Sequence, residues 1–235
     1  MFYSCNLCIY FLGQPFKGFC QVIVNRQELK VLDEEKEEFK SVFKDLGFYF
    51  DEVACKWNDD VEGVIEHVVS RDYGACNLFV CFVQSCVTED WNIKNSDGRT
   101  LDFKSLLAKF TTLKSSHLVR KMPKIFIIQG HKTITALATV ERYDWKSSSD
   151  KLLLGRSFPV RSSDLGEDFL CLFVPYEKGY ISTLLSIIKL PGSRRRDISG
   201  ILLEAKKQFY KNTHVIIPDP IHNLTVPVCL GQETR

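Results

Sequence analysis

Leu78-Phe-Val-Cys-Phe-Val83 contains no polar residue, and this stretch decides the fold. A strand that shows one face to water alternates apolar and polar side chains, so an unbroken apolar run indicates a strand buried on both faces. Such strands are typical of parallel sheets covered by helices on both sides. We expect further strands in four places, at residues 19–24, 49–55, 124–129 and 169–174.

Segments with helical spacing lie between the apolar runs. From Asp33 to Gly47, apolar residues recur at i, i+3, i+4 and i+7, which predicts a helix that Gly47 ends. Further helices are expected near residues 61–68, 102–110 and 197–210. Strand and helix in alternation predict an α/β fold, with a mostly parallel sheet of about six strands between two layers of helices.

Two later segments depart from this rhythm. Residues 133–164 are polar and serine-rich, so we predict a loop or linker there. Val226–Leu230 is predicted to be a last strand, and Pro227 favours a position at the edge of the sheet because proline cannot donate to a strand ladder.

The composition argues against several classes of function. Thirty-one Lys and Arg residues against 29 Asp and Glu give a net charge of +2, which does not indicate a surface for nucleic acid or acidic lipid. No apolar run approaches the roughly 18 residues of a membrane span, so no membrane association is expected. Cys5 and Cys8 have zinc-ligand spacing, but no second Cys or His pair follows, and we expect neither a metal nor a cofactor.

The cysteines indicate the cellular compartment. The chain has nine, an odd number that cannot all pair within it, and several lie inside apolar runs. Their spacing does not form a disulfide framework, so we predict a reducing compartment and a cytoplasmic protein.

The residues after two of the predicted strands carry the candidate chemistry. Gln84-Ser-Cys86-Val87 follows the apolar run Leu78–Val83. Gln129 is the last residue of the predicted strand at 124–129, and Gly-His131-Lys-Thr133 follows it. In an open parallel sheet, ligands bind beyond the carboxyl ends of the strands. A Cys and a His on neighbouring strand ends suggest a thiolate–imidazole dyad, although the spacing alone is a weak signal.

Segments spread along the whole chain match one protein family in order and spacing. They are Lys17–Asn25, Phe43–Phe48, Leu78–Ser85, Pro123–Gln129, Asp168–Leu170, Gly179-Tyr180 and Val226–Cys229. Through these segments the chain resembles the caspase family of cysteine proteases. The resemblance implies a caspase-like three-layer sandwich that forms one folded domain.

The resemblance also implies a division of the chain. Residues 1–16 are then an N-terminal extension, 17–143 correspond to the large subunit, 144–164 to the linker between subunits, and 165–235 to the small subunit. Active caspases are cut within such a linker after aspartate. The corresponding candidates for processing here are Asp150, Asp144 and Asp164.

The departures from the family pattern lie in its active site. His131 stands at the position of the family's nucleophilic Cys, Cys86 at the position of its His, and Val87 at the position of the Gly that helps to bind the oxyanion. No catalytic residue is then left in its place. The family's aspartate pocket keeps its glutamine as Gln129, whereas its two arginines align with Leu29 and Leu184.

A caspase-like chain that lacks the catalytic residues is expected to regulate an active caspase. The resemblance is to pseudocaspases, similar to the cellular caspase-eight-like inhibitory proteins and insect decoy caspases. The expected partner is a catalytically active caspase paralogue in apoptosis, bound as a heterodimer, with activation slightly favoured over inhibition and a homodimer as another form. Candidate interface residues are Val226, Val228 and Leu230.

Two other functions stay open at this stage. The chain could be a residual cysteine peptidase that uses an inverted dyad, with Cys86 as the nucleophile and His131 as the base. The oxyanion donors and the substrate approach are fixed to the strand ends, however, and would then serve the wrong atom. A scaffold that binds no protease is the third possibility.

Overall fold

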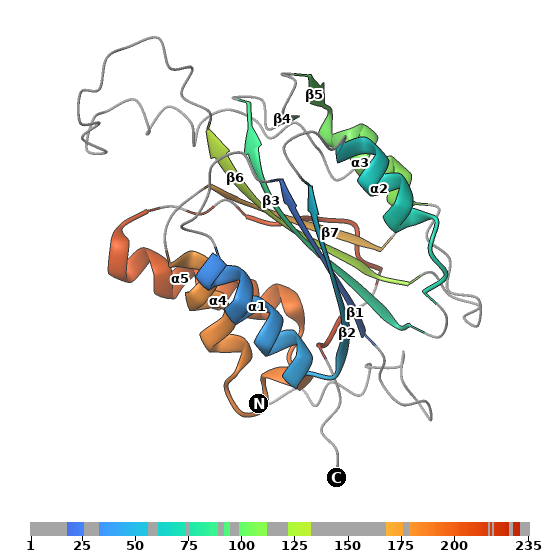
Figure 1. The fold of residues 1–235 in the computed structure, drawn as a ribbon. Helices are drawn as coiled ribbons and strands as arrows, with labels where there is room; N and C mark the ends of the chain where they lie inside the picture. The colour runs from blue at the N-terminus through green and yellow to red at the C-terminus, as the bar shows by residue number, and fades with distance from the viewer. Residues whose placement is uncertain are drawn as a thin grey trace, which may run out of the picture.

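In the computed structural model, the chain forms one twisted central sheet with helices on both faces (Figure 1). The structure describes residues 18–25, 33–55, 61–73, 76–88, 92–94, 99–111, 122–132, 168–175, 179–215, 217, 219–225 and 228–230. The strands are β1 (Gly18–Asn25), β2 (Phe48–Cys55), β3 (Leu78–Val87), β4 (Ile93–Lys94), β5 (Thr100–Leu101), β6 (Lys124–Lys132), β7 (Phe169–Pro175) and β8 (Ile221–His222). The helices are α1 (Asp33–Asp45), α2 (Val61–Val69), α3 (Phe103–Phe110), α4 (Tyr180–Ile188), the short 3-10 helix η5 (Ser193–Arg195) and α5 (Ile198–Thr213).

The order of the strands across the sheet is β2-β1-β3-β6-β7-β8. All pairs from β2 to β7 are parallel, whereas β8 is antiparallel to β7. The short strands β4 and β5 continue antiparallel from the end of β3. This arrangement confirms the predicted α/β fold with a mostly parallel sheet and helices on both faces.

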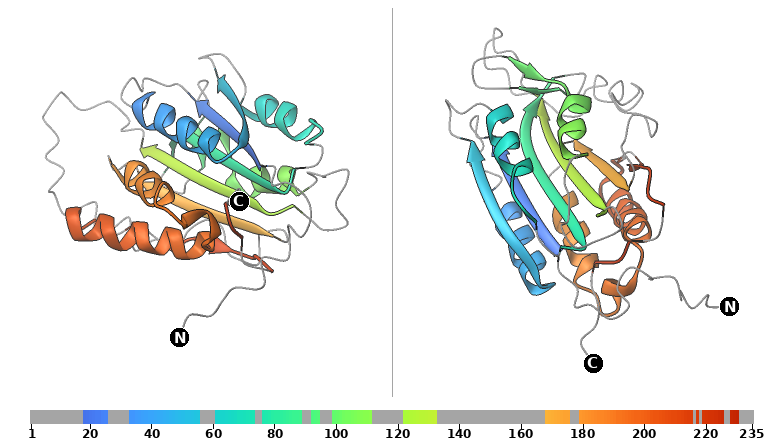
Figure 2. Two further views of the ribbon diagram at one scale, coloured as in Figure 1. Left: turned by 90° about the horizontal axis from the view of Figure 1, so that it is seen from below. Right: turned by 90° about the vertical axis from the view of Figure 1, so that its right-hand side faces the viewer.

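A hydrophobic cluster lies on each face of the sheet. Helices α1, α4 and α5 cover one face, and α2 and α3 cover the other (Figures 1 and 2). On the first face Phe39 of α1 packs on Phe82 of β3, with ring centroids 4.5 Å apart. That cluster also contains Leu172 of β7, so residues from both sides of the predicted linker share one core. None of the described helices is both long and apolar enough to span a bilayer.

The central strands extend further than the sequence predicts. β3 continues from Val83 to Val87, and β6 from Gln129 to Lys132. Polar residues normally indicate the end of a buried strand, but here Gln84 and Gln129 are register partners that bond to each other. The two positions of interest therefore lie inside the sheet and not in loops beyond it.

Two elements of the C-terminal region differ from expectation. Helix α4 was not predicted, because its N-cap residue Gly179 provides no capping side chain and its sequence is rich in β-branched residues. The antiparallel edge strand is β8, earlier in the chain than the predicted Val226–Leu230. Within that range only residues 228–230 are described, and they form an isolated bridge, from Cys229 to Asp197, in place of a strand.

Candidate functional site

Cys86 and His131 are brought to the same level of the sheet. β3 and β6 are adjacent parallel strands, and their register pairs Gln84 with Gln129 and Cys86 with His131. The structure describes only the backbone of His131, but this register places the two positions side by side on the central strands. The sequence prediction that they are neighbours is consistent with this register.

The surroundings of Cys86 do not resemble an open catalytic cleft. Cys86 is 6% exposed and Val87 is 4% exposed. The backbone of Val87 lies between two paired strands, with Lys132 of β6 on one side and Ile93 of β4 on the other. A nucleophile must reach its substrate, so this burial weakens the case for Cys86 as an attacking thiol.

Both polar atoms of the Gln129 side chain are hydrogen-bonded to side chains of the same chain. It is fully buried, and its Oε1 accepts a hydrogen bond of 2.8 Å from Nε2 of Gln84. Its Nε2 donates to Oε2 of Glu35 over 2.9 Å, and the other oxygen of Glu35 accepts from the N–H of Gly179 over 3.0 Å. The glutamine that sequence analysis assigned to a substrate pocket therefore joins β3 and β6 to α1 and to the start of α4.

The carboxylate of Glu35 also stabilises α4. Gly179 is the N-cap residue of that helix, and it provides no side chain to accept a bond there. The N-terminus of a helix carries partial positive charge, which favours an anion. Glu35 supplies this charge from a neighbouring helix, and it is only 8% exposed although it lies in the first turn of α1.

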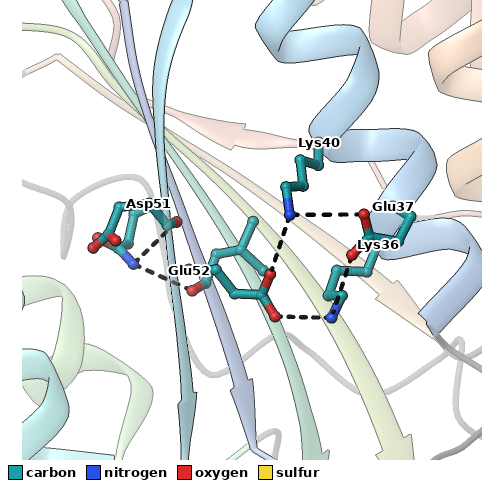
Figure 3. Close-up of polar contacts among 7 residues, drawn as sticks. Lys36, Glu37, Lys40, Asp51 and Glu52 are labelled. Atoms are coloured by element: carbon teal, nitrogen blue, oxygen red, sulfur yellow. Dashed lines mark hydrogen bonds and ion pairs between the residues drawn. The ribbon is translucent and has the colours of Figure 1, made fainter.

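Ion pairs fix the first half of α1 on the sheet edge. Figure 3 shows Lys36 and Lys40 of α1 directed toward Glu52 of β2. The Nζ of Lys36 lies 2.8 Å from the carboxylate of Glu52, and that of Lys40 lies 4.0 Å from it. Lys36 is 5% exposed, so this contact anchors the turn that contains Glu35.

The interface of α1 with α4 has a second polar contact. Oγ of Ser182 donates to Glu38 over 2.9 Å, and Nζ of Lys189 donates to the other oxygen of the same carboxylate over 3.1 Å. Both contacts lie nearer to solvent than the Glu35 contact. The contacts of Lys36 with β2 and of Glu38 with α4 thus hold in place the part of α1 that contains Glu35.

Glu35 and Gln84 were not predicted from the sequence to contribute to this site. Glu35 lies within the acidic stretch Asp33–Glu38, where nothing in the sequence separates a buried carboxylate from exposed ones. Gln84 did give a signal, since it is the first polar residue after an apolar run, but that signal was interpreted as a strand end. Gln84 and Glu35 are linked through Gln129, and the Gln84–Gln129 bond depends on the register of two strands far apart in the chain.

The structure does not support the assignment of Leu184 to a substrate pocket. It was assigned to the aspartate pocket, but it lies inside α4, is fully buried and belongs to the hydrophobic core. The alignment through Gly179-Tyr180 that put Leu184 at an arginine position thus places it in a helix that begins at Tyr180. Leu29, the other pocket candidate, lies outside the described residues, as do Asp144, Asp150 and Asp164.

The predicted interface residues contribute to the chain's own core. Val228 is 4% exposed and Leu230 is 1% exposed. The N–H of Val228 donates to the carboxylate of Asp197 over 3.0 Å, which holds this segment at the start of α5. Neither side chain is presented to a partner here, and Val226 lies outside the described residues.

Three other cysteines are enclosed by the sheet. Burial raises the pKa of Cys20, Cys81 and Cys171, so these thiols stay protonated at neutral pH. Within the described ranges, no cluster of three His, Cys, Asp or Glu residues could hold a metal ion. The described part of the chain thus assembles neither a thiolate centre at these cysteines nor a metal site.

Comparison with known proteins shows the fold. No protein-family model and no curated protein matches the chain. A solved structure described as "structure of pro-sf-caspase-1" superposes with a TM-score of 0.68 over 95% of this chain and 94% of that chain. The two sequences are 14% identical, a level at which similarity shows a shared fold and leaves the activity open. The chain therefore has a caspase-like fold.

Proposed function

We propose that the chain is a non-catalytic caspase homologue, a cytoplasmic regulator that binds an active caspase in apoptosis. The observation that carries the proposal is the register of β3 and β6, which pairs Cys86 with His131, whereas the resemblance puts a His and a Cys at these two positions of the family. Two further features support it. Val87 replaces the oxyanion glycine, and the retained Gln129 already has partners in its own chain.

Heterodimerisation through the sheet edge is the proposed mechanism. In the caspases that the chain resembles, small-subunit strands pair across a two-fold axis. Among the described strands, β8 lies at the edge next to β7 and the side chain of His222 is exposed, so β8 is the pairing edge of this proposal. A partner with an intact fold can order the loops of an active protomer and shift its population toward the competent state, so we favour activation slightly over inhibition.

Co-purification tests this proposal. The tagged chain is co-expressed with active caspases from the same organism, and we expect one of them to co-purify at a fixed ratio. His222→Lys lowers the recovered caspase by about tenfold, because a charge on an edge strand opposes strand pairing. Tyr49→Lys is the matched control, since β2 is the strand at the opposite edge and Tyr49 is 60% exposed.

Cleavage of an aspartyl peptide by the co-purified caspase gives the sign of the regulation. A rate above that of the caspase alone indicates activation, and a lower rate indicates inhibition. If no caspase co-purifies with the unaltered chain, the heterodimer proposal is wrong.

The inverted dyad is the second candidate function. The pairing of Cys86 with His131 favours it, because an imidazole beside a thiol can activate it. The burial of Cys86 opposes it. We therefore expect no reaction of the chain with an aspartyl fluoromethyl ketone, as measured by intact mass. Labelling of the unaltered chain that disappears in Cys86→Ser would establish the peptidase and overturn the pseudoenzyme proposal.

A further inference from the structure

Glu35 is a buried carboxylate held by two N–H donors from other elements. Glu35 accepts from Nε2 of Gln129 over 2.9 Å with one oxygen and from the N–H of Gly179 over 3.0 Å with the other. Its neighbours Glu34 and Glu37 are exposed. The two donors thus form a cradle for one carboxylate at the point where β6, α1 and α4 meet.

The chemistry of the side chains fixes how the cradle is oriented. An ionised carboxylate only accepts hydrogen bonds, so Gln129 must present its NH₂ group to Glu35 and its oxygen to Gln84. The NH₂ group of Gln84 then donates to the oxygen of Gln129. Oε1 of Gln84 is left buried without a hydrogen-bond partner among the described residues. A buried amide oxygen without a donor costs free energy.

The position of the cradle adds an electrostatic component. Gly179 precedes the first residue of α4 and has a φ of 95°. The N–H groups at a helix N-terminus attract anions, and the amide of Gln129 provides a second, side-chain donor. These two donors therefore match the two oxygens of a carboxylate.

We propose that the Gln129 amide and the Gly179 N–H form a carboxylate-binding site, and that Glu35 is an internal ligand that keeps external carboxylates out of it. The unaltered chain then binds no acidic side chain at Gln129, although the glutamine itself is present. This inference deepens the proposed function by explaining why the site stays closed. It rests on contacts within the chain, so its test is independent of any caspase partner.

Replacement of the internal ligand by a small one tests the proposal. Glu35→Ala removes the CH₂–COO⁻ end of the side chain, and acetate carries the same two carbons and two oxygens. We expect the melting temperature of Glu35→Ala to fall below that of the unaltered chain. Sodium acetate at about five times its dissociation constant should raise it again by about 2–4 °C, relative to sodium chloride at equal ionic strength. The unaltered chain should show no such rise.

Three controls separate a specific site from a general salt effect. Pivalate has the same charge as acetate but is too bulky for the cradle, so it should not stabilise Glu35→Ala. Glu38→Ala removes a carboxylate from the same helix and the same interface, but one held by Ser182 and Lys189 nearer the surface, and acetate should not restore it. Glu35→Gln fills the space with an amide and should not respond to acetate.

The outcomes are decisive for the site itself. Equal effects of acetate on Glu35→Ala, Glu38→Ala and the unaltered chain would overturn the proposal. A Glu35→Ala variant that stays unfolded in acetate as well as in chloride would also overturn it, because the cradle must accept acetate in place of the side chain. Failure here leaves the co-purification result unchanged, so the two proposals fail separately.

Discussion

The Phe82→Ala variant unfolds with a free energy about 3–5 kcal/mol below that of the unaltered chain, the largest loss that we expect from one substitution. Phe82 is fully buried at the centre of β3, and its ring stacks on that of Phe39, with the planes 18° apart. Truncation leaves a cavity between the sheet and α1, because a closely packed core collapses only partly around it. Urea unfolding followed by circular dichroism measures the loss.

Leu203→Ala is the matched control for this prediction. Leu203 is also a large apolar residue, but it lies on α5 and is 47% exposed. Alanine is the better helix former, so the free energy of unfolding should change by no more than about 0.5 kcal/mol. Similar losses in both variants would show that the packing of α1 on the sheet is not what holds this face together.

The apolar runs predict the strands of the sheet well, because burial on both faces of the sheet requires an apolar sequence. Every side chain of β3 from Leu78 to Val87 is buried, as the unbroken run at its start indicates. Strand and helix in alternation leave few possible topologies, and the parallel sheet follows from them. This part of the fold depends on residues close together in the chain, which is why the sequence predicts it.

The ends of the strands depend on distant residues, and there the prediction is wrong. A lone buried glutamine would end a strand, since its amide would lack partners. Gln84 and Gln129 continue their strands because each lies opposite the other in the register. Glu35 completes the set from a third element. None of these contacts can be derived from local periodicity, so the closed cradle could be found only in the structure.

Helix α4 shows the same limit on local signals. Its residues Tyr180–Ile188 include three isoleucines and a threonine, residue types that by propensity fit strands better than helices. Packing against α1 and α5 overrides that preference, because six of its side chains are buried there. The incorrect assignment of Leu184 to a pocket follows directly from the missed helix.

The start of β7 carries the other large expected effect. Asp168 has a positive φ of 62°, a conformation that aspartate tolerates better than alanine does. Its Oδ1 accepts hydrogen bonds from the N–H and the hydroxyl of Thr225, over 3.1 and 2.6 Å. Its own N–H donates to the carbonyl of Asn223 over 3.0 Å. This one residue therefore attaches the segment after β8 to the sheet.

Asp168→Ala should lower the free energy of unfolding by about 2–4 kcal/mol, because it removes the acceptor of two hydrogen bonds and leaves a side chain ill suited to positive φ. Asp168→Gly relieves the backbone but not the lost bonds, so it should lose about 1 kcal/mol less than alanine. Asp168→Asn keeps an acceptor oxygen and tolerates the same φ, and it should stay within about 1 kcal/mol of the unaltered chain. Urea unfolding of the three variants tests this order. If glycine and alanine lose equally, backbone conformation makes no contribution, and if alanine loses nothing, Asp168 does not hold the C-terminal segment.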